Sequence, residues 1–367
     1  MAPPTLTVKD LNRATLARQM LLARASAGVV EAVEHLAGMQ AQEPKHPYIG
    51  LWTRIEGFEV ADLRDALLAR EVVRATLMRS TLHLMSADHY RALRMSMQPS
   101  MSVAMRVLGA RSEGLDLEQV LPAARELLAR RPLAFDEIRA QLQEQFADVN
   151  DRALGYAVRT LVALVMVPAE QEPWGFPRAA RFALAEDWLG VPLAEADPAA
   201  LARCYLGAFG PASAVDVQAW SAVGAMKNVL HGMRDELELF VDERGRELFD
   251  LPDAPRPGAS VVAPPRFLPE FDNLVLAHDD RTRIIADQHR PRVTTKNLRV
   301  RATFLWDGFV RGTWTIETKR RVATLRLAPF EALPRGAHEA LRAEGEALLR
   351  FVAPDAKDHD VQFGEPA

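Results

Sequence analysis

The sequence predicts an α+β fold that is mainly helical, with three helix-and-hairpin segments followed by a small C-terminal β-barrel or sheet. Apolar residues recur at helical spacing through most of the first two thirds of the chain. Two short β-type runs follow each group of helices. After a proline-rich connector at 251–258, the apolar period changes to that of strands. A length of 367 residues with 49% hydrophobic content supports several domains with sizeable cores.

The first segment runs from Val8 to Met85. Helices are expected at about 11–21, 30–36, 47–55 and 60–69, the third of them starting at Pro47. Two strands, at 72–78 and 81–85, are expected around the turn Arg79-Ser80. Ser86 is a suitable N-cap for a long helix through Arg106.

The second and third segments repeat this order. Helices at 117–129, 135–146 and 151–164 precede a hairpin within 165–184. The third segment begins near Leu201, has Ser213 as the N-cap of its second helix and places a third helix at 223–233. A hairpin of 238–241 with 247–249 then turns at Arg244-Gly245.

Three helices followed by a two-stranded hairpin is the pattern of a winged helix-turn-helix. Three copies predict a tandem winged-helix body, with domains at 1–115, 116–195, 196–255 and a β-barrel-like region with a C-terminal helix at 256–367. The alternative is an all-helical protein with incidental hairpins.

In the C-terminal region, a hairpin is expected to turn at Asp307-Gly308. A second pair of strands, 313–317 and 322–327, should flank a turn at 318–321. An amphipathic helix is expected at 336–352, and the tail after Pro354 is expected to be mobile.

Composition excludes several classes of protein. A single cysteine, Cys204, permits no intrachain disulfide, and no secretory signal or membrane-length apolar run is present. We therefore expect a cytoplasmic, nucleoid-associated monomer without a membrane partner. The net charge of −4 argues against binding nucleic acid through bulk charge. However, twelve Lys or Arg residues stand against three acids between Arg281 and Arg326, which favours one surface facing a polyanion. The alternative is an exposed arginine-rich β-meander.

The usual catalytic signatures are missing. There is no P-loop, GxSxG or CxxC motif, and the histidines lack zinc-ligand spacing, so no metal or cofactor is expected. Cys204 lies in an apolar helical stretch and is expected to be a core residue. The run Pro269-Glu270-Phe271-Asp272 places two acids near a strand, which is also common in turns.

Several motifs resemble the AlkZ-like DNA glycosylase family over nearly the whole chain. They are LNRATLARQMLL, HLAGMQAQEPKHPYIGLWTRI, VVRATLMRSTLHLMSADHY, FGPAS, LPEFDNLVLAHDDRTRI and DGFVRGTWTI. The resemblance implies three tandem winged helices and a β-barrel in a C-shaped body that holds duplex DNA. Some relatives have aspartate in place of the second glutamine of the Gln-x-Gln motif, whereas this chain has Gln42.

By this resemblance, Gln40 and Gln42 are expected to be catalytic. The DNA-contacting residues that we expect, from the hairpin pattern and from charge, are Arg74, Arg79, Thr81, His83, Lys45, Arg281, Arg283, Lys319 and Arg320. From spacing alone, the favoured interpretation of the two glutamines is structural, as a helix C-terminal cap and a loop amide, and it is the resemblance that favours catalysis. His83 is also readable as a hairpin residue that packs on Tyr90 or Trp52.

Two amides two residues apart constrain the chemistry. On a helix they would lie about 200° apart, whereas in an extended backbone they point the same way. Pro44 favours extended backbone before it. A neutral amide cannot act as a general base, but it can orient water and stabilise a developing cation through its dipole. Such weak assistance suffices when the leaving base is already cationic, as in N7-alkylguanine or N3-alkyladenine.

The resemblance implies a DNA glycosylase, and with the amide chemistry it predicts a monofunctional enzyme that releases alkylated purines, bulky adducts or interstrand crosslinks from double-stranded DNA. Base excision repair and self-resistance to a DNA-alkylating natural product both remain open as its setting. Two other readings also remain open: a noncatalytic winged-helix DNA-binding protein or transcriptional regulator, and a resistance protein that sequesters a drug.

Overall fold

The structure, a computed structural model, describes residues 3–295, 297 and 299–366. Its α-helices are α1 (Val8–Arg18), α2 (Val29–His35), α3 (His46–Trp52), α4 (Val60–Leu68), α5 (Ala87–Ala104), α6 (Leu117–Arg130), α7 (Phe135–Gln145), α8 (Asp151–Leu161), α9 (Ala185–Leu189), α10 (Pro198–Phe209), α11 (Ala214–Ser221), α12 (Met226–Gly232), α13 (Asn273–Leu276), α14 (Arg290–Val293) and α15 (Ala337–Val352). Short 3₁₀ segments lie at Met78–Ser80, Met105–Ser112, Arg234–Glu236 and Asp287–His289. Within the described residues, no helix is both long and apolar enough to cross a membrane.

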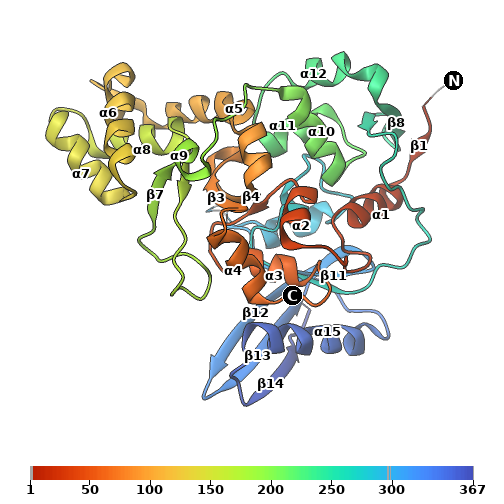
Figure 1. The fold of residues 1–367 in the computed structure, drawn as a ribbon. Coiled ribbons are helices and arrows are strands. Elements are labelled where there is room, and N and C mark those ends of the chain that lie inside the picture. The colour runs from red at the N-terminus through yellow and green to blue at the C-terminus, as the bar shows by residue number, and fades with distance from the viewer. Residues whose placement is uncertain (1–2, 296, 298, 367) are drawn as a thin grey trace.

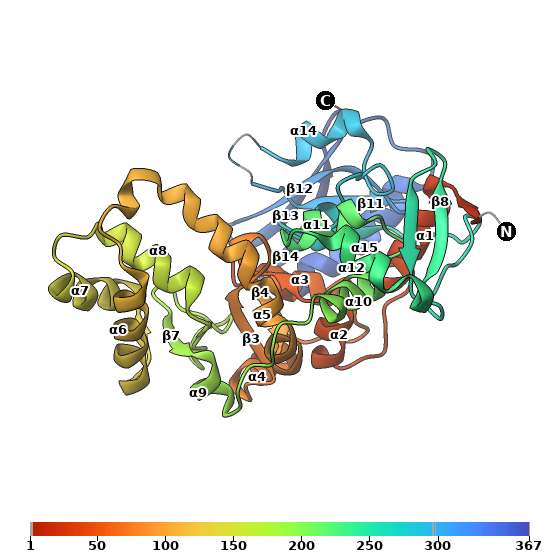
Figure 2. The same ribbon diagram turned by 90° about the horizontal axis from the view of Figure 1, so that it is seen from above.

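The strands form three sheets. They are β1 (Thr5–Leu6), β2 (Met39–Gln40), β3 (Val72–Thr76), β4 (Leu82–Ser86), β5 (Leu133–Ala134), β6 (Leu164–Met166), β7 (Arg181–Leu184), β8 (Glu238–Asp242), β9 (Glu247–Asp250), β10 (Arg266–Leu268), β11 (Thr303–Trp306), β12 (Phe309–Lys319), β13 (Val322–Pro329) and β14 (Asp358–Phe363). The mainly helical α+β prediction is confirmed (Figure 1). Helices α6–α8 lie at one end of the body, away from the C-terminal strands (Figures 1 and 2).

The sheets cross the domain boundaries that the sequence predicts. A six-stranded sheet in the order β2-β4-β3-β6-β7-β5 joins the hairpins of the first two segments, because β3 pairs with β6 through Arg74↔Met166. The N-terminal strand β1 pairs in parallel with β8 of the third segment. The three expected segments therefore share sheets instead of folding as separate modules.

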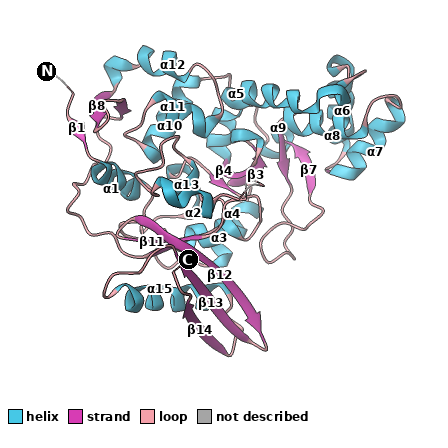
Figure 3. Cartoon of the chain, turned by 180° about the vertical axis from the view of Figure 1, so that it is seen from behind, coloured by secondary structure: helices cyan, strands magenta, loops and turns pink. Residues whose placement is uncertain are grey.

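The C-terminal strands form an open sheet in the order β10-β11-β12-β13-β14. Both edge strands are described, and they do not pair with each other, so the barrel alternative is corrected to a sheet. The predicted turn at Asp307-Gly308 is confirmed, with φ of 47° and 80°, as a two-residue hairpin of this type requires. The long β12–β13 hairpin, seen from behind in Figure 3, turns at Arg320-Arg321.

The expectation of a mobile C-terminal tail is wrong. Residues of β14 pair in parallel with β13 from Val322↔Asp358 to Leu327↔Phe363. Buried Val361 faces α15, where Leu341, Leu348 and Leu349 fill the same apolar core. This pairing satisfies the backbone groups of the tail, which the sequence pattern had not indicated.

The largest apolar core joins the first hairpin to the third segment. Val73 of β3 and Met97 of α5 share it with Tyr205 of α10 and Trp220 of α11. A second core holds Met39 and Ala41 with Leu51 and Leu84. Met39 and Ala41 are therefore packed in the second core, which fixes the position of this segment.

Candidate active site

The Gln-Ala-Gln stretch begins where α2 ends. After the C-cap Leu36, the chain turns through Ala37 and Gly38, both in the left-handed region with φ of 55° and 83°. A Cβ on Gly38 would lie 2.8 Å from the Leu84 carbonyl oxygen, so only glycine fits this close approach. Met39 and Gln40 then pair with β4 as a short strand, as the extended-backbone argument requires.

Successive side chains along this strand point to opposite faces of the sheet. Met39 and Ala41 point into the apolar core they share with Leu84. Gln40 therefore emerges on the other face of the sheet, where its side chain is buried at 8% exposure. Gln42 lies just beyond the strand and is exposed. The Gln40 side chain is therefore buried in the protein, whereas the Gln42 side chain is accessible to solvent.

Arg74 fixes the backbone of the motif. Its Nε donates to the Ala41 carbonyl at 2.9 Å, and its Nη2 donates to the Gln42 carbonyl at 3.1 Å. The guanidinium also lies 5.0 Å from the ring centroid of Phe176, and burial lowers the pKa of Arg74 to about 10. Arg74 is 4% exposed, so the expected DNA contact is corrected to an internal contact that holds the motif.

Arg79 binds the side chain of Gln40. Its Nη2 donates to Gln40 Oε1 at 3.0 Å, and its Nη1 donates to the Trp220 carbonyl at 2.6 Å. Burial, followed by the neighbouring positive charge of Arg281, lowers the pKa of Arg79 to about 10. Arg79 is half-buried, so its expected contact with DNA phosphate stays a prediction beside these contacts within the protein. Trp220 has no sequence signal that links it to the motif.

His83 lies opposite Gln40 on β4. It is fully buried, and burial lowers its pKa to about 3, so it is neutral near pH 7. Its Nδ1 lies 3.0 Å from the Thr81 carbonyl, which requires the proton on Nδ1 and leaves Nε2 as an acceptor. Nε2 has no partner among the described residues. Full burial corrects the expectation that His83 touches DNA.

The other expected DNA contacts differ in their accessibility. Thr81 is half-buried and donates to the Met78 carbonyl within the turn. Arg281 is half-buried and donates to the His278 carbonyl. Lys45 is half-buried with Nζ 5.5 Å from the Trp174 ring centroid, and burial lowers its pKa. Lys319 and Arg320 are exposed at the tip of the β12–β13 hairpin, where Lys319 pairs with Glu317 at 2.5 Å.

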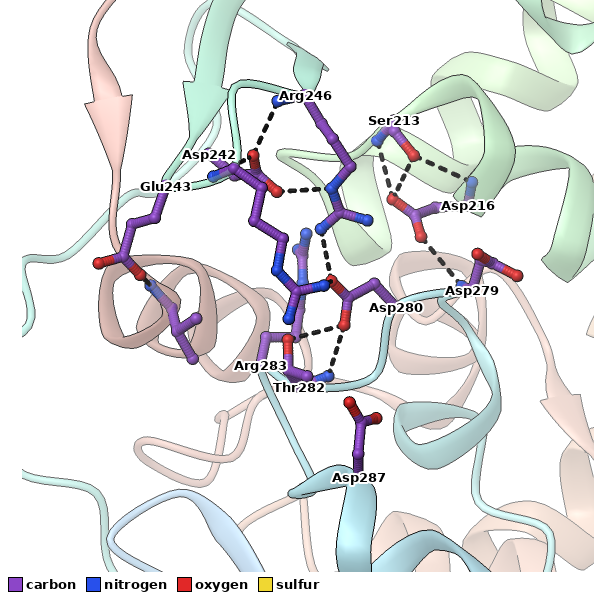
Figure 4. A network of polar contacts seen from close by, with 12 residues as sticks. Ser213, Asp216, Asp242, Glu243, Arg246, Asp279, Asp280, Thr282, Arg283 and Asp287 are labelled. Atoms are coloured by element: carbon purple, nitrogen blue, oxygen red, sulfur yellow. Dashed lines mark hydrogen bonds and ion pairs between the residues drawn. The ribbon is translucent and has the colours of Figure 1, made fainter.

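Arg283 is an interior residue. It is 3% exposed and donates to the Pro211 carbonyl at 2.8 Å. Figure 4 shows it beside the network in which Arg246 bridges Asp242 and Asp280, tying β8–β9 to the segment before α14. Its expected DNA contact is therefore corrected to a structural role.

A small pocket beside Gln40 gathers residues that, apart from Asp272, the sequence analysis did not single out. Its lining includes Gln19, His46, Arg54, Asp272 and Asn273. Asp272 forms a buried two-bond pair with Arg54, at 2.9 and 2.8 Å, and Asn273 donates to the Gly38 carbonyl at 2.9 Å. The acid noted in the run PEFD is thus structural, whereas its neighbour Asn273 supports the motif. The described residues contain no cluster of three or more His, Cys, Asp or Glu placed to hold a metal ion.

Comparison with known proteins decides the family. A sequence profile for the family described as "DNA glycosylase AlkZ-like" matches residues 33–351, which is most of the chain and includes both glutamines. The chain belongs to the AlkZ-like DNA glycosylase family. This confirms the resemblance in the motifs.

Two further similarities cover the AlkZ-like chain almost completely. It is 23% identical over 355 residues to an interstrand DNA cross-link repair glycosylase of Streptomyces sahachiroi, covering 90% of this chain and 95% of that protein. It also resembles the solved structure of Streptomyces sahachiroi DNA glycosylase AlkZ, with a TM-score of 0.82 and 19% identity, covering 98% of this chain and 100% of that one. This structural similarity supports the fold.

Proposed function

We propose that this protein is a monofunctional DNA glycosylase that hydrolyses the N-glycosidic bond of alkylated, cationic purines in double-stranded DNA. The observation that carries the proposal is the extended Met39–Gln40 strand, which holds Gln40 in a buried position while Gln42, two residues further on, lies exposed. Membership of a DNA glycosylase family supports the reaction class. Both glutamines come from one chain, so a monomer suffices.

The proposed reaction needs little acid or base catalysis. A water oxygen bonds to the sugar C1′ while the bond from C1′ to the purine nitrogen breaks. The electron pair of that bond returns to the purine and neutralises it, and the water proton passes to solvent. Gln42, which is exposed, orients the water through its carbonyl oxygen. The amide dipoles stabilise the oxocarbenium-like sugar, and normal uncharged bases leave too poorly to react.

We propose bulky N7-alkylguanine and interstrand crosslinks as substrates, with N3-alkyladenine as a further candidate. Gln42 is exposed and follows the buried Gln40 by two residues, which supports an approach to the sugar from the minor groove while a major-groove adduct stays outside. The three helix-and-hairpin groups would act as winged helices in a C-shaped body around the duplex, with Lys319 and Arg320 contacting phosphate. Repair and self-resistance are both compatible with this chemistry.

The deciding experiment is base release from DNA that contains N7-alkylguanine. Wild type should release the base and leave an abasic site, and Gln40→Ala/Gln42→Ala should not. Full activity of the double variant would remove the proposed mechanism. Parallel assays on methyl and bulky N7 adducts test the substrate range. Failure to release any N7 adduct would contradict the proposed substrate class.

Lys45 provides a separate test of the monofunctional mechanism. Its pKa is lowered by burial, a property that Schiff-base lysines share. We expect no borohydride-trapped complex with DNA, because the motif contains no lysine. A trapped complex that disappears in Lys45→Arg would overturn the claim. Sequence-specific binding that ignores alkylation would instead favour a regulator, and tight binding of the free drug would favour sequestration.

A further inference from the structure

We propose that Arg79 is a positioning residue for this reaction: its guanidinium fixes the side-chain amide of Gln40 so that the NH₂ group faces the substrate. The inference rests on the proposed glycosylase function and adds the direction in which the first amide acts. It assigns different roles to two glutamines that look equivalent in the sequence.

The contacts determine which way the amide points. Arg79 Nη2 lies 3.0 Å from Gln40 Oε1. A guanidinium carries only donors, so it can face the oxygen of an amide but not its NH₂ group. Rotating the Gln40 amide by 180° would break this hydrogen bond and place its NH₂ group against the N–H groups of Arg79, which are also donors. The Gln40 oxygen therefore points to Arg79, and its NH₂ group points elsewhere.

The guanidinium is itself anchored. Its other terminal nitrogen, Nη1, donates at 2.6 Å to the carbonyl of Trp220, near the end of α11. Trp220 is fully buried and packs with Tyr205 and Phe209, with ring centroids 5.3 and 6.3 Å away. Two bonds from the two arms of a planar fork fix its orientation. The motif in the first segment is thus set by the core of the third.

The backbone supports this reading. Arg79 and Ser80 occupy the centre of the β3–β4 turn with φ of 54° and 58°. Turns with positive φ at both central residues favour Asn-Gly, and strained residues of this kind persist where surrounding contacts hold them. Here the side chain of Arg79 supplies two such contacts.

The two glutamines therefore have different roles in the proposed reaction. Gln40, with its oxygen bound to a cation, serves as a hydrogen-bond donor. In N7-alkylguanine, the acceptor it suits is an atom of the departing purine that gains electron density as the glycosidic bond breaks, such as the ring nitrogen N3, which faces the minor groove. Gln42, with an exposed side chain, remains free to accept a hydrogen bond from water.

A double-mutant cycle tests the proposal. Arg79→Met and Gln40→Ala are measured singly and together, by single-turnover base release at saturating enzyme and by affinity for undamaged duplex. We expect each single change to slow release by up to about 100-fold, because a small misplacement of a positioned group can cost about that much in rate. The pair should be no slower than Gln40→Ala alone, affinity should hold within about threefold, and Arg79→Lys should restore part of the rate. Losses that multiply, or a loss of affinity with unchanged rate at saturation, would overturn the proposal.

Two controls keep the outcome clear. Ser80→Gly relieves the same turn without touching the guanidinium, so it should release base at the wild-type rate. The NMR signals of the Gln40 side-chain NH₂ group need no activity: they should move in Arg79→Met and stay in Ser80→Gly. Unmoved signals in Arg79→Met contradict the Arg79 proposal. A wild type that releases no base from any alkylated DNA contradicts the proposed function instead.

Discussion

Gln40 and His83 lie directly opposite each other on antiparallel strands, and their side chains emerge on the same face of the sheet. The next cross-strand pair is Ala41 with Leu82. It is a hydrogen-bonded pair, because Ala41 N donates to the Leu82 carbonyl at 2.7 Å. Gln40 and His83 therefore form the closely spaced, non-hydrogen-bonded pair. A neutral buried imidazole, whose Nε2 has no partner among the described residues, thus borders the Gln40 side chain.

Stability should fall with acidification partly because of His83. Its pKa falls from an ordinary 6.5 to about 3 on folding, so between these values the unfolded chain binds the proton and the folded chain does not. The free energy of unfolding should decrease as the pH drops from about 6.5 toward 3. Chemical denaturation at several pH values should show a shallower decrease in His83→Gln. Identical slopes in the two proteins would contradict the assignment.

The two glutamines should respond differently to a negative charge. Gln42→Glu places a carboxylate in solvent, where it still accepts from water, so base release should stay within about tenfold of wild type. Gln40→Glu should pair with Arg79 and lose the NH₂ donor, which should slow release about 100-fold or more. Single-turnover assays at saturating enzyme measure both. Equal effects at the two positions would argue against separate roles.

Replacing Arg74 should destabilise the motif. Arg74→Met leaves the Ala41 and Gln42 carbonyls without their partner, which should lower the free energy of unfolding by about 2–4 kcal/mol. Arg70→Met is a matched control, since Arg70 also lies over an aromatic ring, Trp188 at 4.2 Å, and donates to a carbonyl, but is exposed. The control should change stability by less than about 1 kcal/mol. Similar losses for both would remove the special role of Arg74.

The buried pair of Arg54 and Asp272 should be costly to break on one side only. Asp272→Ala leaves a buried guanidinium uncompensated and should cost about 3–5 kcal/mol of unfolding free energy. Arg54→Met/Asp272→Leu should cost less than the single change, because no charge remains buried. Denaturant titration measures both. A double variant that is less stable than Asp272→Ala would show that the two charges are not coupled in this way.

The tip of the β12–β13 hairpin should contribute to DNA affinity through charge alone. If Lys319 and Arg320 each neutralise a phosphate, replacing both with alanine should reduce the slope of log affinity against log salt by about 2. The effect should be the same on any duplex sequence. Binding titrations at several salt concentrations test this. An unchanged slope would place the hairpin tip outside the DNA interface.

Local signals in the sequence predict the elements well. Ser86 caps α5, Ser213 caps α11 and Asp307-Gly308 turns between β11 and β12, because each depends on residues within a few positions. The extended Gln40 followed from spacing and Pro44 for the same reason. The parallel strand β14 was missed because its partner β13 is contributed by a distant stretch. The prediction that Arg283 contacts DNA rested on a count of charged residues and is wrong, because composition does not distinguish a buried arginine from an exposed one.

The helix-and-hairpin order and the Gln-Ala-Gln motif could be read from neighbouring residues in the sequence, and the neutrality of the two amides predicts a leaving group that is already good. Only the tertiary structure decided which arginines face inward, and that Arg79 reaches both Gln40 and the Trp220 carbonyl. The reason is physical. Capping, turn and strand signals act between neighbours in the chain, whereas the direction of an amide is set by a donor that packing brings to it. Here that donor is Arg79, 39 positions from Gln40, and it is anchored by the Trp220 carbonyl, 141 positions from Arg79.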